Sequence, residues 1–205
     1  MKMSNEKKRR SNSLRLRGYD YSQPGAYFVT TVTHQRACLF GEIENGIMWL
    51  NDAGKIVRWE WERLTHRFDF VELGAFVVMS NHFHGIIVLQ DVGATRLGYL
   101  DTVSENENLV TNINLRENHK GSPLQAKRSI PKSLGALIGQ FKSRVTKRIH
   151  KTDQFSPERI WQRGFHDRII SNEWEWRNIH LYIESNPDNW EDDSENPLNS
   201  SRDRV

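Results

Sequence analysis

The chain of 205 residues contains a single cysteine, Cys38. No disulfide and no cysteine-based zinc site can therefore form within it, and such sparse use of cysteine is typical of a reducing, cytoplasmic setting. No apolar run comes near the about 18 residues that a membrane span needs, and no apolar segment follows the basic N-terminus as in a secretory signal. The sequence predicts a cytoplasmic protein without a membrane partner.

Motifs for nucleotide hydrolysis and several other chemistries are also missing. Gly93–Gly98 has the glycine spacing of a phosphate-binding P-loop, but Tyr99 stands where that motif needs lysine. The chain has no GxGxxG, HExxH or GxSxG motif. These absences argue against an NTPase, a dinucleotide-dependent enzyme, a zinc protease of the HExxH type and a serine hydrolase.

Charge is distributed unevenly although the net charge is only +3. Residues 1–17 carry seven basic side chains and one acidic one, and residues 188–205 carry six acidic and two basic ones. A basic arm fits either a phosphate-bearing partner or a solvated tail, and charge alone does not decide between them. We predict a basic N-terminal arm (1–24), a domain (25–190) with a loop insertion (91–129), and an acidic C-terminal tail (191–205).

Hydrophobic periodicity predicts an α+β fold. Alternation and β-branched residues indicate strands, and apolar spacings of three and four indicate helices. The expected strands cover 27–34, 70–79, 82–90 and 164–170, a hairpin turns at Asn45-Gly46 within 41–50, and helices cover 51–64, 131–151 and 172–185. Short connections between successive strands favour an antiparallel sheet with helices on one side.

The sequence His82-Phe83-His84 lies in one of the expected strands. Side chains alternate along a strand, so the two imidazoles point to the same face. Such a pair can supply half of a divalent-metal site. From the pair by itself, two partly buried histidines with ordinary hydrogen-bond partners are the simpler explanation.

Tyr182 lies in a polar stripe of the last expected helix, and Asn186 follows one turn later on the same side. A tyrosine in such a stripe is usually a surface or interface residue. A phenol with an ordinary pKa of about 10 is a poor nucleophile at neutral pH. It becomes useful beside a cation or a base, and the histidine pair could hold that cation.

Four motifs in this order and spacing resemble the REP-associated tyrosine transposases, which belong to the wider single-tyrosine, HUH-type transposase-like nucleases. The resemblance runs from about residue 15 to residue 190. The motifs are Gly18-Tyr19-Asp20-Tyr21 with Tyr27-Phe28-Val29-Thr30, Val77 to His84, Trp161 to Ile170, and Tyr182-Ile183-Glu184-Ser185-Asn186-Pro187.

The resemblance implies a ferredoxin-like or RRM-like antiparallel sheet with helices packed mainly on one face. It also implies a single-stranded DNA endonuclease and strand transferase that acts on hairpin or REP-like DNA through a 5′-phosphotyrosine intermediate. His82 and His84 would then bind Mg²⁺ or Mn²⁺, Tyr182 would be the nucleophile, and Asn186 would be a weaker third ligand. Such a protein would act as a monomer or a homodimer.

Basic residues are the expected contacts to the DNA backbone. We predict that DNA contacts come from Arg9, Arg10, Arg15, Arg17, Lys142, Arg144, Lys147, Arg148 and His166. Two alternatives remain open at the level of sequence. One is a non-catalytic module that binds single-stranded nucleic acid. The other is a metal phosphoesterase that uses the histidines with water as the nucleophile.

Overall fold

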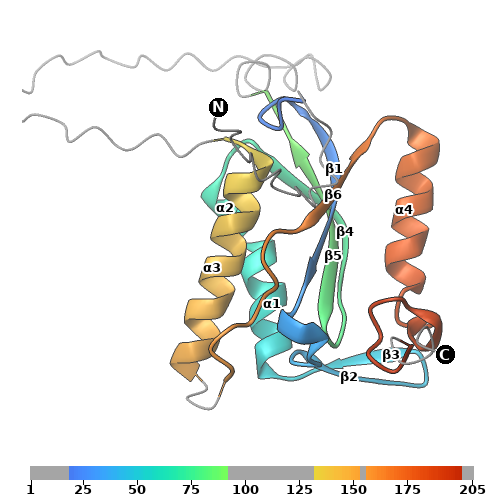
Figure 1. Cartoon of the computed structure of the whole chain (residues 1–205). Coiled ribbons are helices and arrows are strands. Elements are labelled where there is room, and N and C mark those ends of the chain that lie inside the picture. Colours follow the sequence, from blue (N-terminus) through green and yellow to red (C-terminus); the bar gives the residue numbers. More distant parts are fainter. Residues whose placement is uncertain (1–18, 92–131, 153–155, 200–205) are drawn as a thin grey trace, which may run out of the picture.

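The centre of the fold is a four-stranded sheet (Figure 1). The computed structural model describes residues 19–91, 132–152 and 156–199, so residues 1–18 of the predicted arm and nearly all of the predicted insertion lie outside the described residues. The sheet has the order β4-β5-β1-β6, and each neighbouring pair is antiparallel. Its strands are β1 (Gly25–Val32), β4 (Val71–Val78), β5 (His82–Leu89) and β6 (His166–Ile170).

The connections between these strands give a ferredoxin-like topology. Helix α1 (Asp52–Glu62) and the short α2 (Leu64–Arg67) connect β1 to β4, and α3 (Leu134–Thr152) lies between β5 and β6. The short helix η1 (His34–Arg36) and a separate hairpin, β2 (Gly41–Glu44) and β3 (Ile47–Leu50), precede α1. The hairpin turns at Asn45 and Gly46, which both have positive φ angles as a tight turn requires.

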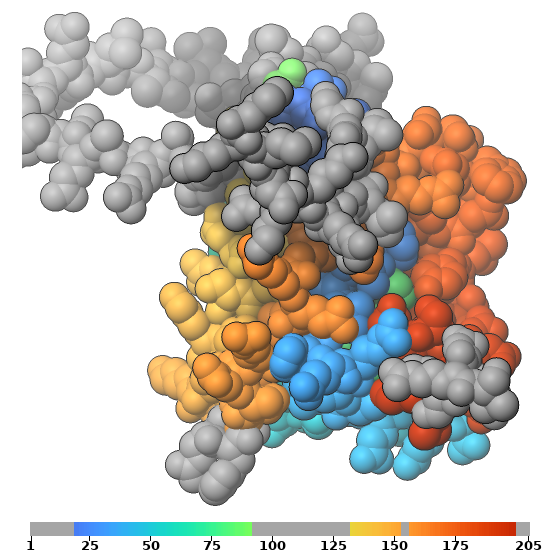
Figure 2. Space-filling view, viewed as in Figure 1, coloured from blue at the N-terminus to red at the C-terminus, as the bar shows by residue number. Residues whose placement is uncertain are grey.

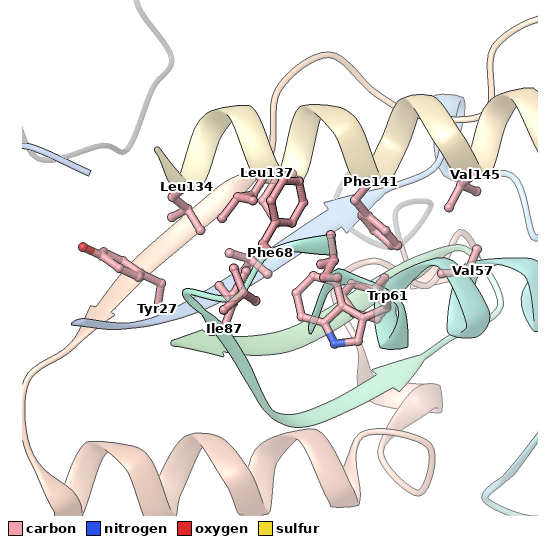
Figure 3. Packing of buried hydrophobic residues seen from close by; sticks show 14 of the residues in the cluster. Tyr27, Val57, Trp61, Phe68, Ile87, Leu134, Leu137, Phe141 and Val145 are labelled. Atoms are coloured by element: carbon pink, nitrogen blue, oxygen red, sulfur yellow. The ribbon is translucent and has the colours of Figure 1, made fainter. Parts of the chain in front are cut away.

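The larger core lies between the sheet and the pair α1 and α3 (Figure 3). Trp61 from α1, Phe141 from α3 and Phe83 from β5 are fully buried and pack with ring centroids 4.6–5.4 Å apart. The apolar stripe expected on the helix 131–151 is buried along its whole length. Burial of this stripe positions α3 and leaves Arg144, Lys147 and Arg148 exposed on its other faces.

Helix α4 (Glu173–Ser185) covers the opposite face of the sheet. Its Ile179 and Ile183 form a second, smaller cluster with Ile86 of β5. The helix is capped by Asn172, whose side chain accepts a hydrogen bond from the backbone N–H of Glu175 at 2.9 Å. The predicted α+β fold with helices mainly on one face is confirmed, and α4 is the helix on the other face.

The chain after α4 includes the first part of the predicted acidic tail. Residues 186–199 form turns and the short helix η2 (Trp190–Asp192), and Asn196 is buried with its side chain bonded to the backbone oxygen of Trp190. Several side-chain amides bond to the backbone here, so this polar segment forms an ordered turn over the described residues. Among the residues that the structure describes, no helix has the length and apolar character needed to cross a membrane.

Candidate active site

The two histidines of β5 lie on the sheet face that α4 covers. Strand β5 pairs with β1 so that His82 is opposite Val32 and His84 is opposite Thr30. Their exposed fractions are 0% and 4%, and their ring centroids are 4.6 Å apart. Because they are two residues apart in a regular strand, both imidazoles point to the same face, as the sequence predicted.

Helix α4 brings Tyr182 to this pair. The hydroxyl oxygen of Tyr182 lies 3.3 Å from Nε2 of His84. The tyrosine ring also makes edge contacts with the rings of His84 and Phe28, at centroid distances of 5.2 and 6.0 Å. The tyrosine remains 46% exposed, so its hydroxyl is held against a buried group while the side chain is open to a large substrate.

The carboxylate of Asp193 lies beside the two histidines, and sequence reasoning did not identify it. Nε2 of His82 lies 3.8 Å from Oδ2 of Asp193, and one ligand atom from each of His82, His84 and Asp193 lies within 4.8 Å of the others. Asp193 follows η2, in the segment predicted as a tail. No spacing distinguishes it from the five other acidic residues of 188–205, so only the folded turn identifies it.

Burial controls the protonation of these groups. It lowers the pKa of His84 well below the ordinary value for histidine, and the neighbouring His82 lowers it further. Burial also lowers the pKa of His82, although Asp193, Glu195 and Asn186 oppose that shift. Both imidazoles are therefore neutral at neutral pH, which is the form that binds a metal ion.

The environment works against ionisation of the tyrosine. Burial raises the pKa of Tyr182 above its ordinary value of 10, and the negative charge of Asp193 adds to the shift, while Asn186 opposes it. A positive charge beside the phenol would reverse the effect of the carboxylate. For the phenol to act as a nucleophile at neutral pH, a cation or a base beside it would have to favour its ionised form.

The residues present fit a divalent cation. Within the described residues, Nε2 of His82 and Oδ1 of Asn186 are buried and have no hydrogen-bond partner. Buried polar atoms are rarely left in this state, and here both are electron-pair donors beside a carboxylate. Two imidazole nitrogens with carboxylate and amide oxygens suit Mn²⁺ and can accept Mg²⁺, while softer ions such as Zn²⁺ also match the nitrogens.

Helix α3, which carries four of the predicted basic residues, lies on the other side of the sheet from α4, which carries Tyr182 (Figure 1). The ammonium group of Lys142 donates hydrogen bonds to the backbone oxygens of Gln162, at 2.7 Å, and Gly164. Arg148 is paired with the buried carboxylate of Glu60 at 3.0 Å. Arg144 and Lys147 are exposed, and they stay predicted DNA contacts.

Lys142 and Arg144 are expected to respond differently to mutation. Lys142→Met leaves two backbone oxygens without their donor and should lower the free energy of unfolding by about 1–3 kcal/mol. Arg144→Ala should change stability by less than about 0.5 kcal/mol. It should weaken the binding of a hairpin oligonucleotide and make that binding less dependent on salt concentration. Urea unfolding and fluorescence anisotropy measure the two effects. Weaker DNA binding by Lys142→Met at unchanged stability would contradict the structural role assigned to Lys142.

His166, unlike the basic residues of α3, lies on the face of the sheet that α4 covers. It is exposed on the edge strand β6 and is opposite Thr30, whose other neighbour across the sheet is His84. His84, Thr30 and His166 therefore form one row across three strands on the α4 face. The remaining predicted DNA contacts, Arg9, Arg10, Arg15 and Arg17, lie outside the described residues.

Comparison with the sequences of known proteins finds a relative of this chain. No family model matches the chain. The chain is 33% identical over 181 residues to an uncharacterized protein of Haemophilus influenzae, and the alignment covers 88% of this chain and 90% of that protein. The chain belongs to the same family as this Haemophilus influenzae protein.

Comparison with solved structures finds a similarity to a transposase. The fold is similar to that of a REP-associated tyrosine transposase solved bound to a REP hairpin, with a TM-score of 0.50. The alignment covers 84% of this chain and 72% of that chain, at 18% sequence identity. The resemblance inferred from the motifs is therefore confirmed as a similarity of fold.

Proposed function

We propose that the protein is a metal-dependent, single-tyrosine endonuclease and strand transferase for single-stranded DNA with a hairpin. The observation that carries this proposal is the 3.3 Å distance between the hydroxyl of Tyr182 and Nε2 of His84, beside a set of potential metal ligands. The phenol and the ligands come from separate elements, α4, β5 and the turn after η2. The half-exposed phenol contacts one of two buried, adjacent imidazoles, so the proposed nucleophile and the proposed ligands lie in one site.

Each side chain has a distinct part in this chemistry. Tyr182 attacks the scissile phosphorus, the bond from phosphorus to the 3′ oxygen breaks, and a 5′-phosphotyrosine bond forms. The phenol proton passes to solvent and the departing 3′ oxygen takes one up. His82, His84 and Asp193, with Asn186, would hold Mg²⁺ or Mn²⁺, which supplies Lewis-acid stabilisation of the phosphate charge. The new ester preserves the phosphodiester bond energy, so another 3′-hydroxyl can reverse the step without ATP.

The approach of DNA follows from exposure. Tyr182 is open to solvent, and His166 lies on the exposed edge strand in the same row as His84. The scissile strand would cross the α4 face over β6, with His166 beside its phosphates. The exposed basic residues of α3 would contact a different part of the DNA, because they lie behind the sheet. The hairpin in the structure of the REP-associated transposase supports hairpin DNA as the substrate class.

A covalent-adduct assay tests the proposal. The protein is incubated with Mn²⁺ and single-stranded oligonucleotides that carry REP-like hairpins, and the products are separated on a denaturing gel. A protein band that carries the labelled downstream fragment, joined through its 5′ phosphate, supports the proposal. Cleavage without any protein-linked DNA indicates water as the nucleophile, and binding without cleavage of any hairpin indicates a non-catalytic module; either result contradicts the proposal.

Asp193 offers a sharper test of the metal ligands. Asp193→Asn keeps the size of the side chain and removes its charge, so we expect Mn²⁺ affinity to fall by at least about 10-fold. The neighbouring Asp192→Asn removes an equal charge from an exposed position and is the matched control. Isothermal titration measures both affinities. Equal losses in the two variants would show that Asp193 acts only through general charge.

A further inference from the structure

We infer that Asn81 is a positioning residue for the candidate metal site. It would fix the tautomer of one histidine ligand and hold the turn that carries the aspartate. Asn81 directly precedes His82 at the start of β5 and has an exposed fraction of 0%. The inference rests on the metal site of the proposed function and assigns a role to a residue that is not itself a ligand.

The amide of Asn81 has only one orientation that satisfies its neighbours. Its Nδ2 lies 3.0 Å from the backbone oxygen of Arg36 and 2.7 Å from that of Glu195. Backbone oxygens only accept hydrogen bonds, so the NH₂ end of the amide must face both of them. The carbonyl oxygen Oδ1 is thereby directed to Nδ1 of His82, at 2.8 Å.

This orientation determines which nitrogen of His82 carries the proton. Oδ1 can only accept, so Nδ1 of His82 must donate. In a neutral imidazole the other nitrogen then has a free electron pair. That nitrogen is Nε2, which is buried, has no hydrogen-bond partner among the described residues and faces Asp193. Outer partners that fix a histidine tautomer in this way are a general feature of metal sites.

The other end of Asn81 holds the chain around Asp193. Glu195, whose backbone oxygen accepts from Asn81, is two residues after Asp193 and is also paired with Arg36, with Nε 2.8 Å from the carboxylate. Figure 2 shows the C-terminal turn, in red, packed beside the segment after β1, in light blue. Asn81 thus connects three separate parts of the chain, and it sets the positions of His82 and Asp193 together.

The test compares Asn81→Ala with Asn51→Ala. The Asn51 amide is a matched control because both of its ends are also bonded, to the backbone N–H of Gly54 and the backbone oxygen of Leu39, where it caps α1. We expect Asn81→Ala to lower Mn²⁺ affinity by about 10- to 100-fold, to change the visible absorption of bound Co²⁺, and to speed hydrogen exchange of the amides at 190–199. Asn51→Ala should lower the melting temperature and leave metal affinity within about two-fold.

A measurement on the unmodified protein avoids any variant that fails to fold. Nitrogen-15 NMR of the metal-free protein should show His82 as the Nδ1–H tautomer, with its signals assigned by their loss in His82→Gln. An Nε2–H tautomer, or unchanged metal affinity in Asn81→Ala, would overturn the inference even if the wild type binds Mn²⁺ and forms the DNA adduct. A wild type that binds no Mn²⁺ would overturn the metal site itself.

Discussion

Tyr182→Phe is expected to abolish the protein–DNA adduct and to reduce strand cleavage by at least about 10³-fold, because the substitution removes the attacking oxygen and little else. The fold should not suffer. The side chain is 46% exposed, its ring contacts with His84 and Phe28 are kept by phenylalanine, and its hydroxyl contacts only side chains of the site, at 3.3 Å from Nε2 of His84 and beside Asn186. The measurement is a denaturing gel of labelled oligonucleotide with thermal unfolding alongside.

Tyr27→Phe is the matched control for this variant. The Tyr27 hydroxyl bonds to the backbone oxygen of Gln23 at 3.0 Å, and its ring lies in the core on the α3 side of the sheet. Its loss should cost about 1 kcal/mol of stability and leave adduct formation intact. An adduct that persists in Tyr182→Phe and disappears in Tyr27→Phe would show that the wrong phenol is assigned.

His84→Gln should reduce cleavage by at least about 10²-fold through loss of the metal ion. Glutamine is similar in size to histidine, but its amide is a poor replacement for imidazole as a ligand. His84 contacts the tyrosine hydroxyl through Nε2, and its Nδ1 lies 2.8 Å from the hydroxyl of Thr30. The Mn²⁺ affinity and the adduct yield should fall together. Treatment of the wild type with EDTA should reproduce the loss of adduct, and added Mn²⁺ should restore it.

The partly buried His180 of α4 is the control for this experiment. Its Nδ1 lies 3.4 Å from the carboxylate of Glu184 on the same helix, and it is not among the potential metal ligands. His180→Gln should leave metal affinity and adduct yield within about two-fold, as expected for a surface position. If His84→Gln loses cleavage but keeps Mn²⁺ affinity, its role is confined to the tyrosine.

Most of the fold follows from periodicity in the sequence. Each expected strand and helix within the described residues has a counterpart, with ends that coincide or differ by up to three residues. The strength of the signal has a physical cause, since α3 and β5 each bury a continuous apolar face. The face chosen by α4 was harder to foresee. This helix has apolar positions on two sides, and Trp174 and Leu181 on one of them remain exposed, at 72% and 62%.

The candidate site was only partly accessible from sequence. The pair His82 and His84 and the position of Tyr182 follow from periods of two and of three to four residues, which are local properties. Asp193 and Asn81 do not, because their contacts join residues that are up to 114 positions apart. Such contacts depend on the path of the turn after η2, and no local period encodes that path. The predicted tail therefore contained the missing carboxylate.

The order in which the chain is made adds a consequence. In the proposed centre, the imidazoles come from positions 82 and 84, whereas the phenol and the carboxylate come from positions 182 and 193. A ribosome that has released only the first hundred or so residues exposes a histidine pair with no group able to attack DNA. Under the proposed function, DNA cleavage would then wait until translation passes the last helix, because a chain truncated before α4 would lack the attacking phenol.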